Sequence, residues 1–154
     1  MAGIRALSET RRVTLPDERS TEALAKSFAA ELQKGDVIAL TGELGAGKSV
    51  FARALIQSRG EMAGVEIGAV PSPTFTLVQH YDLTDFPIYH FDLYRLSDPE
   101  EAWEIGLEDA FAEGASLIEW ADRIDALLPP GTVGVHISPG VEESTRYADI
   151  SQRP

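Results

Sequence analysis

The sequence has no cysteine, and this excludes disulfide bonds and thiol chemistry. It also has no asparagine, so the Asn-Lys-x-Asp motif with which regulatory GTPases read guanine is absent. No apolar run approaches the roughly 20 residues that a membrane-spanning helix needs, and residues 1–12 carry no apolar signal region. These absences predict a cytoplasmic protein without a membrane anchor.

Basic residues are scarce: 13 Lys and Arg stand against 25 Asp and Glu, for a net charge of −12 at pH 7. Such a chain repels a polyanion unless its few basic side chains cluster tightly. We therefore expect no binding of nucleic acid by the chain alone. Its 154 residues, 44% hydrophobic and 25% charged, are enough for one core, and we predict a single domain over residues 1–154.

One segment matches the phosphate-binding loop pattern G-x-x-x-x-G-K-[ST] at every fixed position. It consists of Gly42, Glu43, Leu44, Gly45, Ala46, Gly47, Lys48 and Ser49. The apolar run at 37–41 before it suits a buried parallel strand, and residues 50–56 after it have helical apolar spacing. The loop therefore has the strand-to-helix context that its function requires.

The chemistry of this pattern predicts a nucleoside triphosphate with Mg²⁺. The glycines let backbone N–H groups turn inward around phosphate oxygens. Lys48 places a positive charge on the β- and γ-phosphates, and Ser49 offers a hydroxyl to Mg²⁺. With the guanine motif absent, adenine is favoured, so we expect ATP as the nucleotide.

The remaining pattern alternates strand and helix signals and predicts an α/β fold of the phosphate-loop NTPase type. We expect a three-layer sheet of mixed parallel and antiparallel strands with helices on both faces. Expected strands are 13–15, 37–41, 75–81, 87–94, 116–120, 133–137 and 147–150. Expected helices run from a cap at Ser20 or Thr21 to about Lys34, from the phosphate loop to about Arg59, over 101–105, after Gly106, and over 124–128.

A phosphate loop needs a further carboxylate, usually from the end of a nearby apolar strand. Two acids have this position: Asp92 closes the run 88–91, and Glu119 closes the run 117–118. Either could hold Mg²⁺ while the other orients or deprotonates the attacking water. The residues alone do not order the two.

Other polar residues near these motifs have alternative explanations. His90 shares a strand face with Asp92 but is interpreted as a structural group without a catalytic role. Arg95 could reach phosphate or pair with an acid, and Trp120 is expected to pack in the core. Thr74, between two prolines and an aromatic residue, could sense a γ-phosphate or cap a turn.

Four segments resemble the bacterial TsaE family, also called YjeE, in order and spacing. They read GDVIALTGELGAGKS, PSPTFTLVQHYD, YHFDLYRLSDPEEAWEIGLED and SLIEWADR. The resemblance extends from about Leu15 to Arg146. It implies an ATPase that supports the threonylcarbamoyladenosine modification of tRNA, works with the TsaD and TsaB proteins, and resets their complex between turnovers without transferring the group itself.

The resemblance also implies residue roles. Segment 72–75 becomes a switch-like loop, Glu119 the Mg²⁺ ligand beside Ser49, and Asp92 the acid for the water or the outer shell of the metal. Thr21 matches a position near the adenine, and Arg146 one that lies against the nucleotide. The chain departs from the family at Glu43, where many members have Asp, and at Ala121, where Pro is frequent.

Two other functions share the phosphate loop. A small-molecule kinase would need an acceptor pocket and an arginine-bearing lid. Residues 115–130 contain a single basic residue, Arg123, so no dense basic lid is visible there. A nucleotide-gated binding module would assemble with partners while hydrolysis remained incidental. Stimulation of hydrolysis by partners would separate the module from the ATPase.

Overall fold

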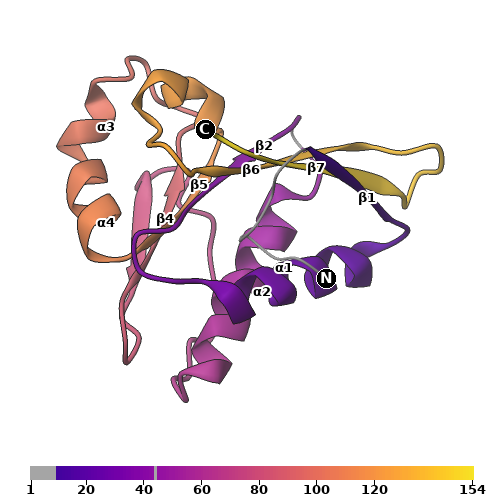
Figure 1. Ribbon diagram of the computed structural model, residues 1–154, viewed down its shortest axis with the longest axis horizontal. Helices are drawn as coiled ribbons and strands as arrows, with labels where there is room; N and C mark the ends of the chain where they lie inside the picture. The colour runs from indigo at the N-terminus through magenta and orange to yellow at the C-terminus, as the bar shows by residue number, and fades with distance from the viewer. Residues whose placement is uncertain (1–9, 44) are drawn as a thin grey trace.

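The computed structural model describes residues 10–43 and 45–154, and these build one seven-stranded mixed sheet (Figure 1). Its order is β1-β7-β6-β2-β5-β4-β3. The strands are β1 (Arg11–Leu15), β2 (Val37–Thr41), β3 (Val78–Tyr81), β4 (Ile88–Asp92), β5 (Ala115–Glu119), β6 (Val133–Pro139) and β7 (Arg146–Gln152). β2 pairs in parallel with β5 and β6, and β4 with β5, whereas the β1–β7, β6–β7 and β3–β4 pairs are antiparallel. The mixed sheet predicted from the sequence is confirmed.

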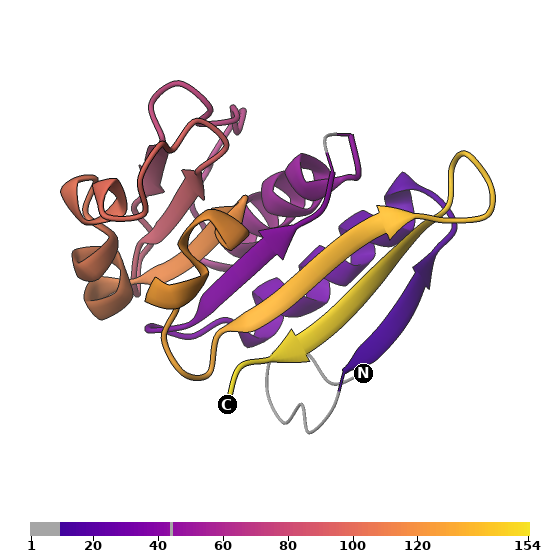
Figure 2. The same cartoon turned by 90° about the horizontal axis from the view of Figure 1, so that it is seen from above.

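Helices cover both faces of this sheet, as the sequence predicts. They are α1 (Glu18–Glu31), α2 (Lys48–Met62), α3 (Glu101–Glu104), α4 (Leu107–Glu113) and a 3₁₀ helix, η1 (Ala121–Leu127). One core cluster joins α1 and α2 to one face, with the Phe28 and Phe51 rings edge to face at 5.4 Å. A second cluster joins α3, α4 and η1 to the opposite face of β2, β4 and β5. Figure 2 shows α1 and α2 side by side along the sheet.

Helix α1 begins earlier than the sequence pattern suggested. Its N-cap is Asp17, whose carboxylate accepts the Ser20 backbone N–H at 2.9 Å, so neither Ser20 nor Thr21 is the cap. Thr21 is instead buried, with 4% of its surface exposed. The helix also ends at Glu31, before Lys34. Asp17 is the cap in place of Ser20 or Thr21, because its side chain reaches a free N–H group of the first turn.

Gly60 lies inside α2 and does not end it, contrary to the prediction that this helix stops near Arg59. A Cβ at Gly60 would lie 2.3 Å from Cγ1 of Ile67. The glycine therefore serves close packing of the following loop against the helix. Residues 64–73 have no helix or strand, as their prolines predict.

The two hairpin strands are shorter than predicted, since β4 covers 88–92 instead of 87–94, and β5 is shifted by one residue toward the N-terminus. β3 starts only at Val78, because residues 74–76 form a turn and Leu77 has a positive φ of 69°. β5 stops at Glu119, because Trp120 adopts the left-handed conformation with φ 58°. Left-handed backbone is uncommon outside glycine and interrupts strand pairing. Both interruptions lie beside the same end of the sheet.

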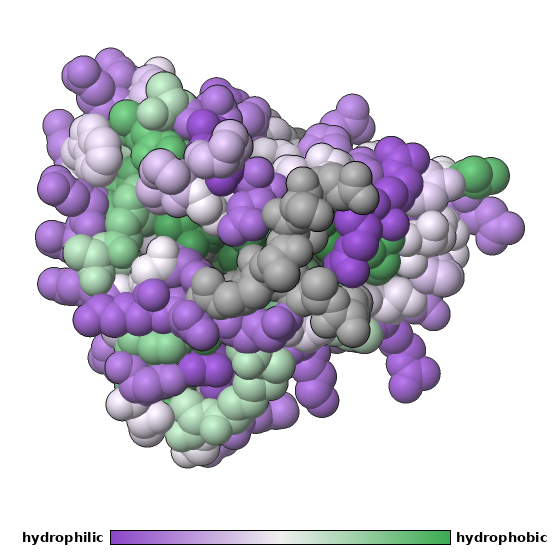
Figure 3. All heavy atoms as spheres, in the orientation of Figure 1, coloured by the Kyte–Doolittle hydropathy of each residue, from purple (hydrophilic) through white to green (hydrophobic). Residues whose placement is uncertain are grey.

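The surface is mainly hydrophilic on the face shown in Figure 3. None of the helices in the described residues has the length and apolar character needed to cross a membrane. One face of the sheet is exposed to solvent along β1, β6 and β7, and Arg12 pairs with Asp149 there at 2.8 Å. One-sided exposure of this kind is usual for antiparallel strands.

Candidate functional site

The phosphate loop joins the carboxyl end of β2 to α2, and a cavity of about 260 Å³ opens beside it. The carboxyl ends of β4 and β5 reach the same cavity, because both strands run parallel to their neighbours in this part of the sheet. Its lining residues are Gly45, Gly47, Lys48, Ser49, Val50, Ser72, Thr74, Asp92, Glu119 and Trp120. The carboxyl ends of parallel strands are where α/β proteins place ligands.

The glycines of the loop adopt backbone conformations that other residues rarely enter. Gly42, Gly45 and Gly47 have φ values of 137°, 79° and 112°. At Gly42 a Cβ would also lie 2.3 Å from the carbonyl oxygen of Ile137, so strand β6 packs directly on the loop. Gly47 precedes the first residue of α2 and no side chain caps that end. The free N–H groups of the helix start therefore face the cavity side of the loop. Leu44 lies outside the described residues.

Lys48 is held within the loop. Its Nζ donates to the carbonyl oxygens of Gly42 at 2.6 Å and Glu43 at 2.8 Å, and lies 4.2 Å from the centre of the Trp120 ring. Burial lowers the pKa of Lys48, while the nearby carboxylates of Glu119, Asp92 and Asp122 act in the opposite direction. The Lys48 ammonium group thus lies beside the position that phosphate oxygens would occupy. Carbonyl oxygens and a ring face substitute for water around it.

Glu119 lies between two side chains from different elements. Its Oε1 accepts the Ser49 hydroxyl at 3.2 Å, and its Oε2 lies 2.6 Å from His90 Nε2. Glu119 and His90 are each 2% exposed. Hydroxyl and carboxylate oxygens are the hard ligands that Mg²⁺ takes, so Ser49 and Glu119 fit this ion chemically.

The rest of the site suits an ion that shares its ligands with a phosphate. Among residues 10–43 and 45–154, no cluster of three or more His, Cys, Asp or Glu could hold a metal unaided. Mg²⁺ commonly binds through one or two protein oxygens and completes its shell with phosphate and water. The geometry therefore matches a metal carried by its nucleotide.

Asp92 faces the loop that follows Pro71. Its Oδ2 accepts the hydroxyls of Thr74 at 2.9 Å and Ser72 at 3.1 Å, and its Oδ1 accepts the Tyr94 backbone N–H at 3.1 Å. Asp92 and Glu119 are register partners on β4 and β5, so the two acids are neighbours. Of the two acids, Glu119 is hydrogen-bonded to Ser49 of the phosphate loop, whereas Asp92 is hydrogen-bonded to the 72–75 segment.

A second cavity of about 240 Å³ lies next to the first. It shares Gly45, Gly47 and Val50 with the first cavity and adds Asp17, Glu18, Thr21, Ala46, Ser144 and Arg146. Thr21 and Arg146, which are 125 positions apart in the sequence, thus lie beside the same loop. The Arg146 guanidinium donates to the carbonyl oxygens of Glu143 and Thr145. The two cavities therefore lie on either side of the same glycine-rich segment.

Sequence reasoning missed several contacts of the site. His90 was interpreted as structural, yet it touches the acid that touches Ser49. Its two-residue spacing from Asp92 was the available signal, because it places His90 on the site face of β4. Arg95 forms no ion pair with an acid in the described residues, and its guanidinium lies 4.5 Å from the Phe75 ring centre. Its contact with phosphate stays a prediction. Trp120 packs between Lys48 and Tyr94, whose ring centre is 4.8 Å away.

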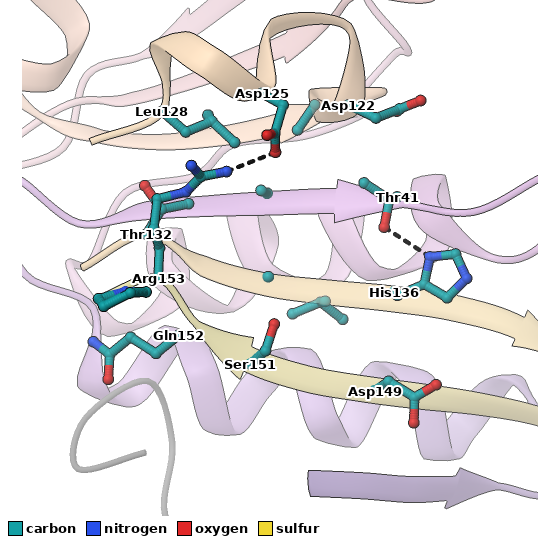
Figure 4. A pocket seen from close by; sticks show the side chains of 15 residues that line it. Thr41, Asp122, Asp125, Leu128, Thr132, His136, Asp149, Ser151, Gln152 and Arg153 are labelled. Atoms are coloured by element: carbon teal, nitrogen blue, oxygen red, sulfur yellow. Dashed lines mark hydrogen bonds and ion pairs between the residues drawn. The ribbon is translucent and has the colours of Figure 1, made fainter. Parts of the chain in front are cut away.

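A larger hollow of about 390 Å³ lies between η1 and the solvent-facing side of β6 and β7, and none of the phosphate-loop residues 42–49 lines it (Figure 4). Thr41 and His136 are bonded at 2.8 Å there, and Asp125 pairs with Arg153 at 2.6 Å. The contacts drawn in Figure 4 satisfy these polar groups within the hollow. The smaller cavity at the phosphate loop brings together two acids, a lysine and three hydroxyls, and is therefore the stronger candidate for a chemical site.

Comparisons with known proteins agree on one group. The family model described as threonylcarbamoyl adenosine biosynthesis protein TsaE matches residues 15–148. The tRNA threonylcarbamoyladenosine biosynthesis protein TsaE of Rickettsia conorii is 44% identical over 137 residues, which cover 89% of this chain and 75% of that protein. The protein of the same name from Haemophilus influenzae is 40% identical, with coverage of 80% and 78%.

A solved structure supports the fold. The crystal structure of YdiB from Bacillus subtilis superposes with a TM-score of 0.75 at 27% identity. The match covers 97% of this chain and 89% of that one. The α/β sheet and its phosphate-loop helix therefore belong to an architecture already seen by crystallography.

Proposed function

The chain belongs to the TsaE family of tRNA threonylcarbamoyladenosine biosynthesis proteins, and we propose that its part in that process is to bind and hydrolyse ATP with Mg²⁺. One observation carries the proposal. Lys48, Ser49, Glu119 and Asp92 come from three separate parts of the sequence and line one cavity at a glycine-rich helix start. This set supplies charge compensation, a metal-binding pair and an acid for water, which are the needs of phosphoryl transfer.

The nucleotide would lie along the two joined cavities. Backbone N–H groups at the start of α2 would bind phosphate oxygens, and Lys48 would exchange its carbonyl partners for the β- and γ-phosphates. Thr21 and Arg146 line the part of the cavity that remains for the base and sugar. Mg²⁺, when bound with ATP, would neutralise charge that develops between the β- and γ-phosphates.

The two acids would divide the work at the γ-phosphate. Glu119 and Ser49 would provide the protein oxygens for the metal, since their side chains already face each other at 3.2 Å. Asp92 would accept a proton from the attacking water or hold that water in line. Asp92 accepts two hydroxyls from segment 72–75, so engagement of Asp92 with water requires these contacts to rearrange.

The 72–75 segment would therefore report the state of the nucleotide. Ser72 and Thr74 contact Asp92 through their hydroxyls, and Phe75 at the end of the segment is 81% exposed. A γ-phosphate that draws Thr74 away from Asp92 would move the exposed ring as well. Switch segments in other nucleotide-binding proteins respond to the γ-phosphate in this manner.

We further propose that this ATPase acts with the TsaD and TsaB proteins in the cytoplasm and resets their complex between turnovers. The tRNA would be reached through those partners, because a chain of net charge −12 has few basic residues to spare for phosphate contacts. The motif resemblance supplies the partners, and the acidity supports the indirect contact with tRNA.

Calorimetric titration of the purified chain with ATP and GTP, with Mg²⁺ and with EDTA, tests the first step. We expect ATP to bind more tightly than GTP, and Mg²⁺ to increase the affinity for ATP. Absence of ATP binding by a chain shown to be folded by circular dichroism would contradict the proposal.

A further inference from the structure

His90 and Glu119 form a buried hydrogen bond that the phosphate-loop chemistry does not by itself require. They lie on neighbouring parallel strands, β4 and β5, and both point to the face covered by α1 and α2. Their nitrogen and oxygen are 2.6 Å apart, and each residue is 2% exposed. A carboxylate removed from water needs a donor for each oxygen, and His90 serves Oε2.

The second ring nitrogen fixes how His90 is protonated in this contact. His90 Nδ1 is buried and has no hydrogen-bond partner among the described residues. A proton on Nδ1 would be a buried donor without an acceptor, which is more costly than an unpartnered lone pair on a nitrogen. The geometry therefore favours the tautomer whose proton is on Nε2, where it can be donated to Glu119 Oε2 at 2.6 Å.

This donation leaves the other carboxylate oxygen free for the site. With Oε2 held by His90, Oε1 points to the Ser49 hydroxyl at 3.2 Å. We propose that His90 is a positioning residue that fixes the carboxylate plane of Glu119 for the metal that Ser49 and Glu119 would share. The inference rests on the proposed Mg²⁺-ATP function of the site, and it deepens that function by assigning the partner behind the metal ligand.

A purely structural role explains the contact less well. The register partner of His90 on β5 is Leu117, which is 1% exposed and belongs to the apolar core on this face. An apolar side chain at position 90 would fill this place without leaving a buried nitrogen unpartnered. Among the residues that the structure describes, the bonded ring nitrogen has Glu119 as its partner, so orientation of that acid is what the imidazole provides.

The test compares His90→Phe, which keeps a ring and removes the donor, with His90→Gln, whose amide N–H can occupy the place of Nε2. His80→Phe is the matched control, because His80 is an exposed histidine that also contacts a carboxylate, Asp82, at 3.1 Å. The measurement is ATP affinity by calorimetry as Mg²⁺ is titrated, and thermal melting establishes folding. Mn²⁺ binding to the ATP complex, followed by electron paramagnetic resonance, gives a second readout without turnover.

In His90→Phe we expect Mg²⁺ to bind about 10- to 100-fold more weakly in the ATP complex, since loss of a hydrogen bond behind a metal ligand has this effect in other sites. ATP affinity in EDTA should be unchanged. His90→Gln should recover most of the loss, and His80→Phe should match the wild type. Unchanged Mg²⁺ affinity in folded His90→Phe, or equal losses in the Phe and Gln variants, would overturn the inference.

Two further results distinguish a failure of the proposed function from a failure of the role of His90. If the wild type binds no Mg²⁺-ATP, the proposed function fails before His90 is tested. If His90→Phe does not fold, nitrogen-15 chemical shifts of the imidazole in the wild-type chain decide the matter. A proton on Nε2 supports the donation to Glu119, and a proton on Nδ1 alone contradicts it.

Discussion

The proposed binding of ATP depends most directly on Lys48. Lys48 is 5% exposed, and its ammonium group contacts two backbone carbonyl oxygens of the loop and an indole ring. Because its partners in the free chain are neutral, exchange for phosphate oxygens gains charge-assisted hydrogen bonds. Burial lowers the pKa of Lys48, and the nearby carboxylates of Glu119, Asp92 and Asp122 only partly offset this effect.

We expect Lys48→Ala to weaken ATP binding by roughly tenfold to over a hundredfold, since a hydrogen bond to a charged group contributes about 1.5 to 3 kcal/mol. Calorimetric titration with Mg²⁺-ATP measures this change. Lys26→Ala, at an exposed position of α1, is the matched control and should bind as the wild type does. An unaltered affinity in folded Lys48→Ala would remove the phosphate-loop assignment.

Substitution of Asp92 and of Glu119 should have different effects on ATP binding and hydrolysis. Asp92→Asn keeps the shape of the side chain and removes its charge, so ATP should still bind while hydrolysis falls by about 10² or more. Glu119→Gln should instead reduce the effect of Mg²⁺ on binding. Asp82→Asn, in the exposed β3–β4 turn, is the control. Steady-state phosphate release and calorimetry provide the comparison, and hydrolysis at the wild-type rate by Asp92→Asn would show that its catalytic role is wrong.

At the scale of elements, the contact between the phosphate loop and β6 limits what the loop tolerates. Gly42 has φ 137°, and a Cβ there would lie 2.3 Å from the Ile137 carbonyl oxygen. Gly64 also has a positive φ, 71°, but nothing lies within 4 Å of its Cβ position. A side chain at either glycine would strain the backbone, but only a side chain at Gly42 would also clash with the sheet.

Gly42→Ala should therefore destabilise the chain more than Gly64→Ala and should also lose ATP affinity. Strain at a positive φ alone costs about 1 to 3 kcal/mol, and the clash at Gly42 adds to it. Thermal melting and ATP titration of both variants give the measurement. Equal melting temperatures for the two variants would mean that the loop moves away from β6 at little cost.

Much of the element pattern follows from the sequence, and the exceptions have physical reasons. The phosphate loop with its flanking strand and helix was predictable, because glycine spacing and apolar periodicity are local signals. The exact ends near Leu77 and Trp120 were not, because tertiary contacts hold these two residues at positive φ. The approach of Thr21 and Arg146 to the loop depends on sheet order, and only the family resemblance indicated it.

Pair contacts across the sheet were the least predictable part of the site. The sequence placed Asp92 and Glu119 at strand ends but left their roles open. The register of β4 on β5 makes them neighbours, and the start of α2 then places Ser49 against Glu119 alone. Register and helix position are non-local, so neither composition nor spacing could order the two acids.

At the scale of the whole molecule, the net charge of −12 supports the proposal that this chain does not bind tRNA by itself. Phosphate contacts supply most non-specific affinity for nucleic acid, and they need clustered basic side chains. We expect no tRNA complex of the isolated chain in a gel-shift assay at about 0.15 M salt, where exposed charges are screened beyond roughly 8 Å. A tight complex of tRNA with the chain alone would contradict indirect contact through partners.

Assembly with partners should instead follow the nucleotide. Gel filtration with TsaD and TsaB should show stronger co-elution with a non-hydrolysable ATP analogue than with ADP, because the γ-phosphate biases the 72–75 segment. Equal co-elution in both states would defeat the switch role of that segment while leaving ATP binding intact.

The most direct measurement is phosphate release from ATP by the purified chain with TsaD and TsaB, compared in Mg²⁺ and in EDTA. The site geometry predicts hydrolysis that requires Mg²⁺ and that falls by about 10² or more in Asp92→Asn. Phosphate release that is absent with Mg²⁺ and partners, or equal in the wild type and in Asp92→Asn, would contradict an ATPase built on Lys48, Ser49, Glu119 and Asp92.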